Sequence, residues 1–415
     1  MNRKQFAFLF VLLIVLGGAG WYVQQSRNRT ANSGDAGTGQ KLLGDVFPVN
    51  DVARISIKEG TNEANLAKQD DIWRVRERYN YPANFSTISE TLLKLQDLKI
   101  VQTEQVGASQ LPRLQLAPAG QGTNSGVLVD LLGKDGKSIK TFTLGKKHLR
   151  KPSAGQPSPF GDEGFPDGRY VLLAGNSQNA LLIADPLASL EPKPEQWLNK
   201  EFFKVERPKA IAVTFPAATN SWKLQRDSET GDWKLAGAKA DEKLDDARVS
   251  GVSSPFASPS FNDVLATNTK PADVGLDSPT VVTVDTFDDL TYTVKVGAKS
   301  GNDYPLTLTV TANFPKERIP AKDEKPEDKV KADKAWADRQ KQLDETFKRA
   351  KQFEGWTYLV PAWTVDPILK DRKDLLAEKK EEPKTAENSS DKTNAAPDKP
   401  VIFDDQQKPV PKDQP

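Results

Sequence analysis

The sequence contains no cysteine and a single histidine, His148. Without cysteine, the chain cannot form disulfides, thiolate zinc sites, iron–sulfur clusters or a cysteine nucleophile, and it lacks the cysteine of a lipoprotein signal. One histidine excludes any site that needs two histidines from one chain. No Ser-His-Asp arrangement is recognisable either, because His148 lies in a basic run. The commonest thiol-based and histidine-based sites are therefore missing, and we predict no cofactor and no enzymatic activity.

Neither sign of charge predominates. The 415 residues include 58 lysines and arginines against 57 aspartates and glutamates, which gives a formal net charge of +1. So small a net charge provides no overall field that would attract nucleic acid, and we expect no nucleic-acid partner. Hydrophobic residues make up 37% of the chain, below the usual share for a globular protein, because long polar segments dilute the folded regions.

A long hydrophobic run is present at the N-terminus. Residues 6–23 are eighteen consecutive uncharged and mostly apolar residues, which as a helix would span about 27 Å and cross the hydrocarbon core of a bilayer. Because Arg3 and Lys4 precede the run, we expect a single-pass anchor in the inner (cytoplasmic) membrane, with a cytoplasmic N-terminus and the bulk of the chain periplasmic or otherwise extracytoplasmic. A cleaved signal peptide, with Gly18 and Gly20 before the cut, is the alternative.

Composition divides the rest of the chain into segments. The stretch 26–41 is polar and glycine-rich, as in flexible linkers, and 378–415 is rich in Lys, Glu, Asp and Pro, as in disordered tails. We predict a transmembrane anchor at 1–25, the linker at 26–41, a first folded unit at 42–191, a connector at 192–207, a second folded unit at 208–377 and the disordered tail at 378–415.

The two folded units are predicted to be copies of one domain. The segment VARISIK at 52–58 aligns with PKAIAVT at 208–214, and both alternate apolar and polar residues as half-buried strands do. Further strand pairs follow in the same order, among them a pair that carries Trp73 and Trp233 and a pair that ends in Gly145 and Gly297. We expect these tryptophans, together with Trp222, to lie in the core rather than to form a sugar-stacking platform.

Helices are predicted to be few. Thr87 and Glu90 have the spacing of a capping box, which would open a helix with Ile88, Leu92 and Leu95 on one face. A charged helix is predicted within 327–354, inserted between two strands of the second unit and without a match in the first. The fold class is therefore α+β: two tandem, mostly antiparallel-sheet units with few helices, plus one N-terminal transmembrane helix.

Several short motifs resemble those of a bacterial family, the domain-of-unknown-function family numbered 4340. They are Phe47-Pro48 followed by a V-x-x-I-x-I strand at 52–57, a Leu-x-Lys strand at 66–68, Trp73-Arg-Val75, a Leu-x-x-Leu helix end at 95–98 and a Gly-Leu-x-x-Pro turn at 275–279. The first unit departs at the last motif, with Gln115 in place of the glycine, so that turn is expected to differ. The resemblance implies no biochemical activity. It implies an accessory role at the membrane, because some relatives lie beside or are fused to auxiliary components of gliding-motility-type ABC transporters.

The long loop from Lys151 to Gly168 is the candidate partner-contact region, since loops of this length inside a compact unit are often functional. Its candidate contact residues are Lys151, Phe160, Asp162, Glu163, Phe165 and Asp167. The adjoining basic residues, which we expect to contact an anionic surface or to be simply solvated, are Lys146, Lys147, His148 and Arg150. The three loop carboxylates lack the spacing of a calcium loop, and we predict no metal site. The segment from Gly133 to Ser138 lacks the first glycine of a phosphate-binding loop, which favours a hairpin turn.

From the anchor, the duplicated domain and the missing catalytic set, we expect a non-enzymatic scaffold or accessory protein. Its expected partners are the lipid bilayer, through residues 6–23, and a membrane protein complex such as ABC-transporter subunits. Two alternatives stay open. One is a periplasmic module that binds a small ligand or glycan. The other is a hydrolase that uses only carboxylates, which the sequence cannot place relative to one another.

Overall fold

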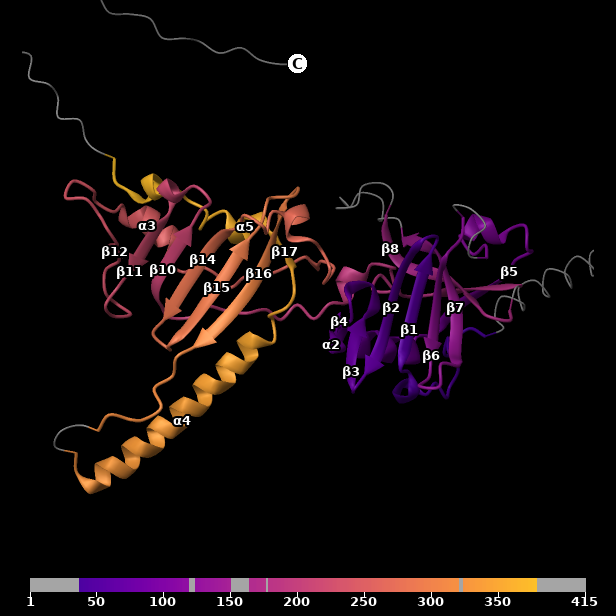
Figure 1. The fold of residues 1–415 in the computed structure, drawn as a ribbon. Helices are drawn as coiled ribbons and strands as arrows, with labels where there is room; N and C mark the ends of the chain where they lie inside the picture. The colour runs from indigo at the N-terminus through magenta and orange to yellow at the C-terminus, as the bar shows by residue number, and fades with distance from the viewer. Residues whose placement is uncertain (1–36, 119–123, 151–163, 177, 321–323, 379–415) are drawn as a thin grey trace, which may run out of the picture. The chain divides into compact units, whose positions relative to one another are not determined.

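Two antiparallel sheets make up most of the regular structure in the computed structural model (Figure 1). The residues that the structure describes are 37–118, 124–150, 164–176, 178–320 and 324–378. Those up to Leu376 belong to one compact unit. With two mostly antiparallel sheets and four α-helices in the described ranges, the chain has the α+β composition that the sequence predicts.

The first sheet has nine strands in the order β4-β3-β2-β1-β6-β7-β8-β9-β5. A helix, α2 (Phe85–Asp97), joins β4 to β5 at the opposite edges of this sheet. The bounds of the strands are β1 (Arg54–Glu59), β2 (Asn62–Gln69), β3 (Ile72–Val75), β4 (Tyr81–Pro82), β5 (Ile100–Gln105), β6 (Val127–Leu132), β7 (Ser138–Arg150), β8 (Phe165–Leu173) and β9 (Asn179–Ile183).

The second sheet has eight strands in the order β12-β11-β10-β14-β15-β16-β17-β13. Three helices accompany it: α3 (Asp246–Val252), α4 (Pro326–Lys351) and α5 (Ala362–Val365). The bounds of the strands are β10 (Pro208–Thr214), β11 (Trp222–Gln225), β12 (Lys234–Leu235), β13 (Asp263–Val264), β14 (Thr280–Thr286), β15 (Leu290–Val296), β16 (Asp303–Ala312) and β17 (Tyr358–Pro361).

The two sheets share one order over eight strands, and β4 at the edge of the first sheet has no counterpart among the described strands of the second. In the first, β1 lies between β2 and β6, and in the second, β10 lies between β11 and β14. The next three strands follow in sequence in both sheets, and β5 and β13 close the far edge. Register agrees with this correspondence, because Ile57 pairs with Val129 and Val213 pairs with Val282. The strands aligned by the sequence repeat therefore hold equivalent places, while the unit boundaries themselves stay a prediction.

Alternation of side chains gives each central strand one core face and one outer face. In β15, Leu290, Tyr292, Val294 and Val296 are all buried, whereas Thr291, Thr293 and Lys295 between them are not. Because side chains point to opposite faces with a period of two, this pattern places the second group on an outer, polar face. Trp73 and Trp222 are buried, and Trp233 packs partly buried against the same core. The prediction that these tryptophans belong to the core is confirmed.

The turn before β6 contradicts the expectation drawn from its missing glycine. Gln115 has a left-handed backbone with φ of 55°, and Gly275 before β14 has φ of 68°. Both residues end a short 3-10 helix, η3 (Leu111–Leu114) or η7 (Pro271–Val274). At this position the two turns thus have similar backbone conformations, because Gln115 adopts the geometry that glycine adopts more readily, although the first turn reaches its proline one residue sooner.

These turns pack directly on the two glycines that the repeat aligns. A Cβ added to Gly145 would lie 2.4 Å from the carbonyl oxygen of Leu114, and one added to Gly297 would lie 2.2 Å from that of Val274. Contacts this short exclude any side chain without a backbone shift. Only glycine therefore fits at either position, and for the same reason, which is the close approach of a neighbouring backbone.

Helix α2 begins three residues earlier than the capping-box spacing suggests. Asn84 is its N-cap, and the side-chain Oδ1 of Asn84 accepts a hydrogen bond from the backbone N–H of Thr87 at 3.3 Å. The prediction that Thr87 caps the helix is therefore wrong, since a better-placed acceptor stands upstream. The predicted apolar face is confirmed, because Ile88, Leu92 and Leu95 are all buried.

Helix α4 is the charged helix predicted between two strands of the second unit. It lies between β16 and β17 in sequence, and no helix joins β8 to β9 among the residues described there. Only its C-terminal half packs against the core: Leu343 and Ala350 are buried, and Phe347 meets Phe314 with ring centroids 6.2 Å apart. The remaining turns are mostly exposed, as their charged composition predicts.

The connector between the sheets is bonded to both of them. On the side of the first sheet, the backbone N–H of Asn84 donates to the carbonyl of Trp197 at 2.7 Å. On the side of the second, the N–H of Val205 donates to the carbonyl of Phe256 at 3.0 Å. Trp197 itself is fully buried. The predicted connector 192–207 is thus packed into the core rather than exposed as a free tether.

The predicted membrane span at 6–23 lies outside the described residues, as do most of the linker 26–41 and all but the first residue of the tail 378–415. In the part of the chain that is described, no helix combines the length and the apolar character needed to cross a bilayer.

Candidate functional site

The structure places the predicted contact residues in two groups. Lys151, Phe160, Asp162 and Glu163 lie outside the described ranges. Phe165 and Asp167 belong to β8, which is longer than the sequence indicates. The basic run Lys146, Lys147, His148 and Arg150 forms the end of β7 rather than a solvated loop, because β7 and β8 continue to pair up to Arg150 and Phe165.

Two members of the basic run are held by carboxylates. The Nδ1 atom of His148 lies 2.6 Å from Oδ1 of Asp167, and Nζ of Lys147 lies 3.2 Å from Oε1 of Glu191. A hydrogen bond from Lys193, and then one from Lys147, holds the pKa of Glu191 below its usual range despite partial burial. Of the lysines and arginine in the run, Lys147 is therefore the one with a carboxylate partner among the described residues. No sequence pattern identifies Asp167 as the partner of His148, because the two residues are brought together only by the pairing of β7 with β8.

The glycine-rich segment between β6 and β7 is a hairpin turn, as predicted. Gly136 has a left-handed backbone with φ of 76°, and Ser138 begins the next strand. The hydroxyl of Thr141 donates to Oδ1 of Asp130 across the hairpin at 2.7 Å. A strand rather than a helix follows the turn, so the arrangement of a phosphate-binding loop is not formed here.

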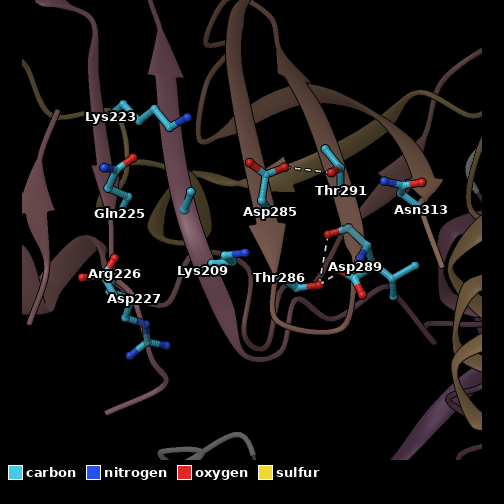
Figure 2. Close-up of a pocket in the computed structure, with 12 residues that line it drawn as sticks. Lys209, Lys223, Gln225, Arg226, Asp227, Asp285, Thr286, Asp289, Thr291 and Asn313 are labelled. Carbon is cyan, nitrogen blue, oxygen red and sulfur yellow. Dashed lines mark hydrogen bonds between the residues drawn. The ribbon is translucent and has the colours of Figure 1, made fainter. Parts of the chain in front are cut away.

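A shallow hollow on the outer face of the second sheet is the candidate site (Figure 2). We call it the β10 hollow, because β10 runs through it between β11 and β14. Its volume is about 410 Å³. The residues that line it are Lys209, Ala210, Lys223, Gln225, Arg226, Asp227, Asp285, Thr286, Asp289, Leu290, Thr291 and Asn313.

Small side chains on β10 create the hollow. Ala210 and Ala212 are the outward-facing residues of this strand, and Ala210 pairs with Gln225 on one side and Asp285 on the other. The longer side chains of those neighbours therefore rise above a floor of methyl groups. In the first sheet, register places Arg54 and Ser56 at the positions of Ala210 and Ala212. The long Arg54 side chain stands where the floor of a hollow would be.

The basic side of the hollow comes from β10 and β11. Lys209 sits where the pairing of β10 with β14 shifts register, and both it and Lys223 are exposed. Arg226 is more constrained: its Nε donates to the carbonyl of Pro208 at 2.9 Å, and its guanidinium lies 4.6 Å from the ring centroid of Trp233. These contacts hold Arg226 at the edge of the hollow, and Nζ of Lys209 lies 6.0 Å from the ring centroid of Phe287.

The acidic side comes from β14 and the turn that follows it. Oδ1 of Asp285 accepts a hydrogen bond from the hydroxyl of Thr291 at 2.7 Å, as Figure 2 shows. The hydroxyl of Thr286 accepts from the backbone N–H of Leu290 at 3.2 Å and donates to its carbonyl at 3.0 Å, which closes the turn that carries Asp289. Asp227, in contrast, is paired with Lys234 at 2.6 Å. The free carboxylate groups therefore lie opposite the two lysines.

Ion pairs brace the turn between β14 and β15, next to the hollow. Arg207 donates to both Glu229 and Asp288, and Arg339 of α4 also donates to Asp288. The hydrogen bond from Arg207 lowers the pKa of Glu229. Because Asp288 lies in the β14–β15 turn, these bonds connect the turn to α4 and to the start of β10.

Sequence reasoning missed the β10 hollow, although one signal was present. The alignment of 52–58 with 208–214 sets Arg54 against Ala210, a change from a long cation to a methyl on the outer face of an equivalent strand. Over the described ranges, no group of three or more His, Asp or Glu side chains is placed to hold a metal ion.

Comparison with known proteins yields one family. Residues 73–279, just under half of the chain, match the model of a family described as "Domain of unknown function (DUF4340)". The match begins in β3 and ends directly before β14, so it includes strands of both sheets. No curated protein and no solved structure is detectably similar to this chain.

Proposed function

We propose that this protein is a non-enzymatic scaffold or accessory protein, anchored in the inner membrane by residues 6–23 and exposed on the extracytoplasmic side. The observation that carries the proposal is the junction between two sheets of the same strand order. One continuous cluster of buried apolar residues includes strands of both sheets and the connector. A duplicated domain joined in this way presents two related outer faces in a fixed arrangement, which is what a scaffold requires.

An ion pair and an aromatic cluster support the junction. Arg78, which follows β3, donates from Nε and Nη2 to the carboxylate of Asp263 in β13 at 2.5 and 2.7 Å. Burial alone would lower the pKa of Arg78, but the hydrogen bond and charge of Asp263 raise it above its usual value. Tyr81 packs edge-on against Phe261 and Trp356, with ring centroids 5.8 and 5.0 Å apart. Bidentate pairing and edge-to-face stacking both favour a defined geometry.

The proposed partner is a membrane protein complex of the ABC-transporter type. This part rests on the apolar run at 6–23 and on the resemblance to a family whose relatives accompany such transporters. On the second sheet, the outer face of β15 is polar, with Thr291, Thr293 and Lys295 in a row. Such a face fits the wet, polar contacts of a non-obligate complex better than a permanent apolar interface.

Site-specific crosslinking in cells tests the proposal. A photo-reactive amino acid would replace Gln225 at the β10 hollow in the full-length protein. A second probe position would be Ala67, which occupies the equivalent place on β2. Recovery of transporter permease or ATPase subunits from either position, identified by mass spectrometry, would support the scaffold. Reproducible recovery of this chain alone, from both positions, would count against it.

A second candidate function is favoured by the β10 hollow itself. Its volume of about 410 Å³ lies within the range of small-ligand sites, although most such sites are more apolar. A ligand-binding module would use this hollow whether or not the protein also works as a scaffold.

A further inference from the structure

We propose that the β10 hollow binds a short zwitterionic peptide, about two or three residues long, with its free amino group at Asp285 and Asp289 and its free carboxylate at Lys209 and Lys223. This proposal goes beyond the scaffold function and does not depend on it. It rests on the separation of charge across the hollow, on its width and on Ala210 in its lining, whose register position in the first sheet is held by Arg54.

Charge is sorted by strand in the β10 hollow. Lys209 and Lys223 lie on β10 and β11, and Asp285 and Asp289 lie on β14 and in its turn (Figure 2). Among the described residues, no carboxylate lies within ion-pair distance of either lysine, and no cation lies within that distance of either aspartate. A ligand that carries one charge of each sign would therefore satisfy both sides, whereas a simple anion or cation would satisfy only one.

The width of the hollow selects the length of the ligand. β11 and β14 are both neighbours of β10, so two strand spacings, about 10 Å, separate them. An extended chain covers at most about 3.3–3.6 Å per residue, so two or three residues bridge that span. A single amino acid, whose two charges share one carbon atom, is too short for the span from Lys223 on β11 to Asp285 on β14, between which Lys209 lies on β10.

The floor of the hollow favours a ligand with small side chains. The two apolar residues that line it are Ala210 and Leu290. The other lining groups, including Gln225, Thr291 and Asn313, can form hydrogen bonds with peptide N–H and carbonyl groups. Because the site is open and its charges are exposed, we expect weak binding, in the millimolar range.

The test is a titration of the purified full-length protein, in detergent, with alanyl-alanine. Binding is measured by saturation-transfer NMR. N-acetyl-alanyl-alanine, which lacks the ammonium group, and alanyl-alanine amide, which lacks the carboxylate, are the matched ligands. We expect the free dipeptide to bind and each blocked form to bind at least about fivefold more weakly, since each loses one side of the charge pairing. Equal binding of all three, or no binding of any, would overturn the proposal.

A pair of variants locates the site. Ala210→Arg would place in the second sheet the side chain found at Arg54 in the first, and it is expected to abolish dipeptide binding by filling the floor. Ser56→Arg adds the same group to β1 and should leave binding unchanged. Should Ala210→Arg unfold, Asp285→Asn and Lys223→Gln remove one charge each with little change of shape. Binding that is unaltered in both of these charge variants would refute the site.

Discussion

Removal of the Arg78 side chain from the junction between the sheets should have a large and specific effect on stability. The side chains of Arg78 and Asp263 are 21% and 23% exposed, and Arg78 also lies 3.2 Å from Glu195. In Arg78→Met the apolar stem is kept, but Asp263 loses two charged hydrogen bonds and stays mostly buried. A buried charge that loses its partner costs about 3–5 kcal/mol. Because about a fifth of each side chain meets solvent, we expect a loss of about 2–3 kcal/mol.

The assay is urea unfolding of the full-length protein in detergent, monitored by tryptophan fluorescence. Lys234→Met is the matched control, because its partner Asp227 is 83% exposed, and exposed pairs contribute about 1 kcal/mol or less. A double-mutant cycle with Asp263→Asn would measure the coupling between the two side chains. A coupling energy near zero, or a loss no greater than that in the control, would refute the view that this pair holds the two sheets together.

Two further predictions concern single positions. Gly145→Ala should destabilise by several kcal/mol, as close overpacking does, because its Cβ would meet the Leu114 carbonyl at 2.4 Å. Gly251→Ala in α3 is the control, since nothing lies within 4 Å of its Cβ; equal effects in thermal unfolding would contradict the packing argument. Glu191→Gln should destabilise at neutral pH. The folded-state pKa of Glu191 is lowered from 4.5, so its contribution is full above that value and disappears as pH falls through the folded pKa. If the difference in free energy of unfolding between wild type and Glu191→Gln stayed the same in acid, this dependence on the Glu191 charge would be excluded.

Local patterns were enough to find most strands and the long helix. Alternation over 127–132 matches β6 residue for residue, and the apolar spacing of Ile88, Leu92 and Leu95 matches the buried face of α2. Such patterns depend only on neighbours along the chain, so they can be seen without the fold. The start of α2 was misjudged because Asn84 and Thr87 are both good caps, and the path of the chain before the helix selected Asn84.

The candidate site could not be derived in the same way. Its residues extend from Lys209 to Asn313, which are 104 residues apart in the sequence, and only strand order brings them together. The same is true of His148 with Asp167, which are 19 residues apart, and of Arg78 with Asp263, which are 185 apart. No periodicity connects such pairs, since each partner has an ordinary local pattern.

By itself the sequence determined the α+β class, the repeated strand pattern and the equivalence of Gly145 with Gly297, because these depend on alternation and on residue types that repeat. Tertiary structure alone decided that Gln115 adopts the backbone of Gly275, that the connector is packed into the core, and that Ala210 opens a hollow where Arg54 closes one. The physical reason is that burial, cavities and ion pairs depend on which strands lie side by side. That order is set by the whole core rather than by any segment of the chain.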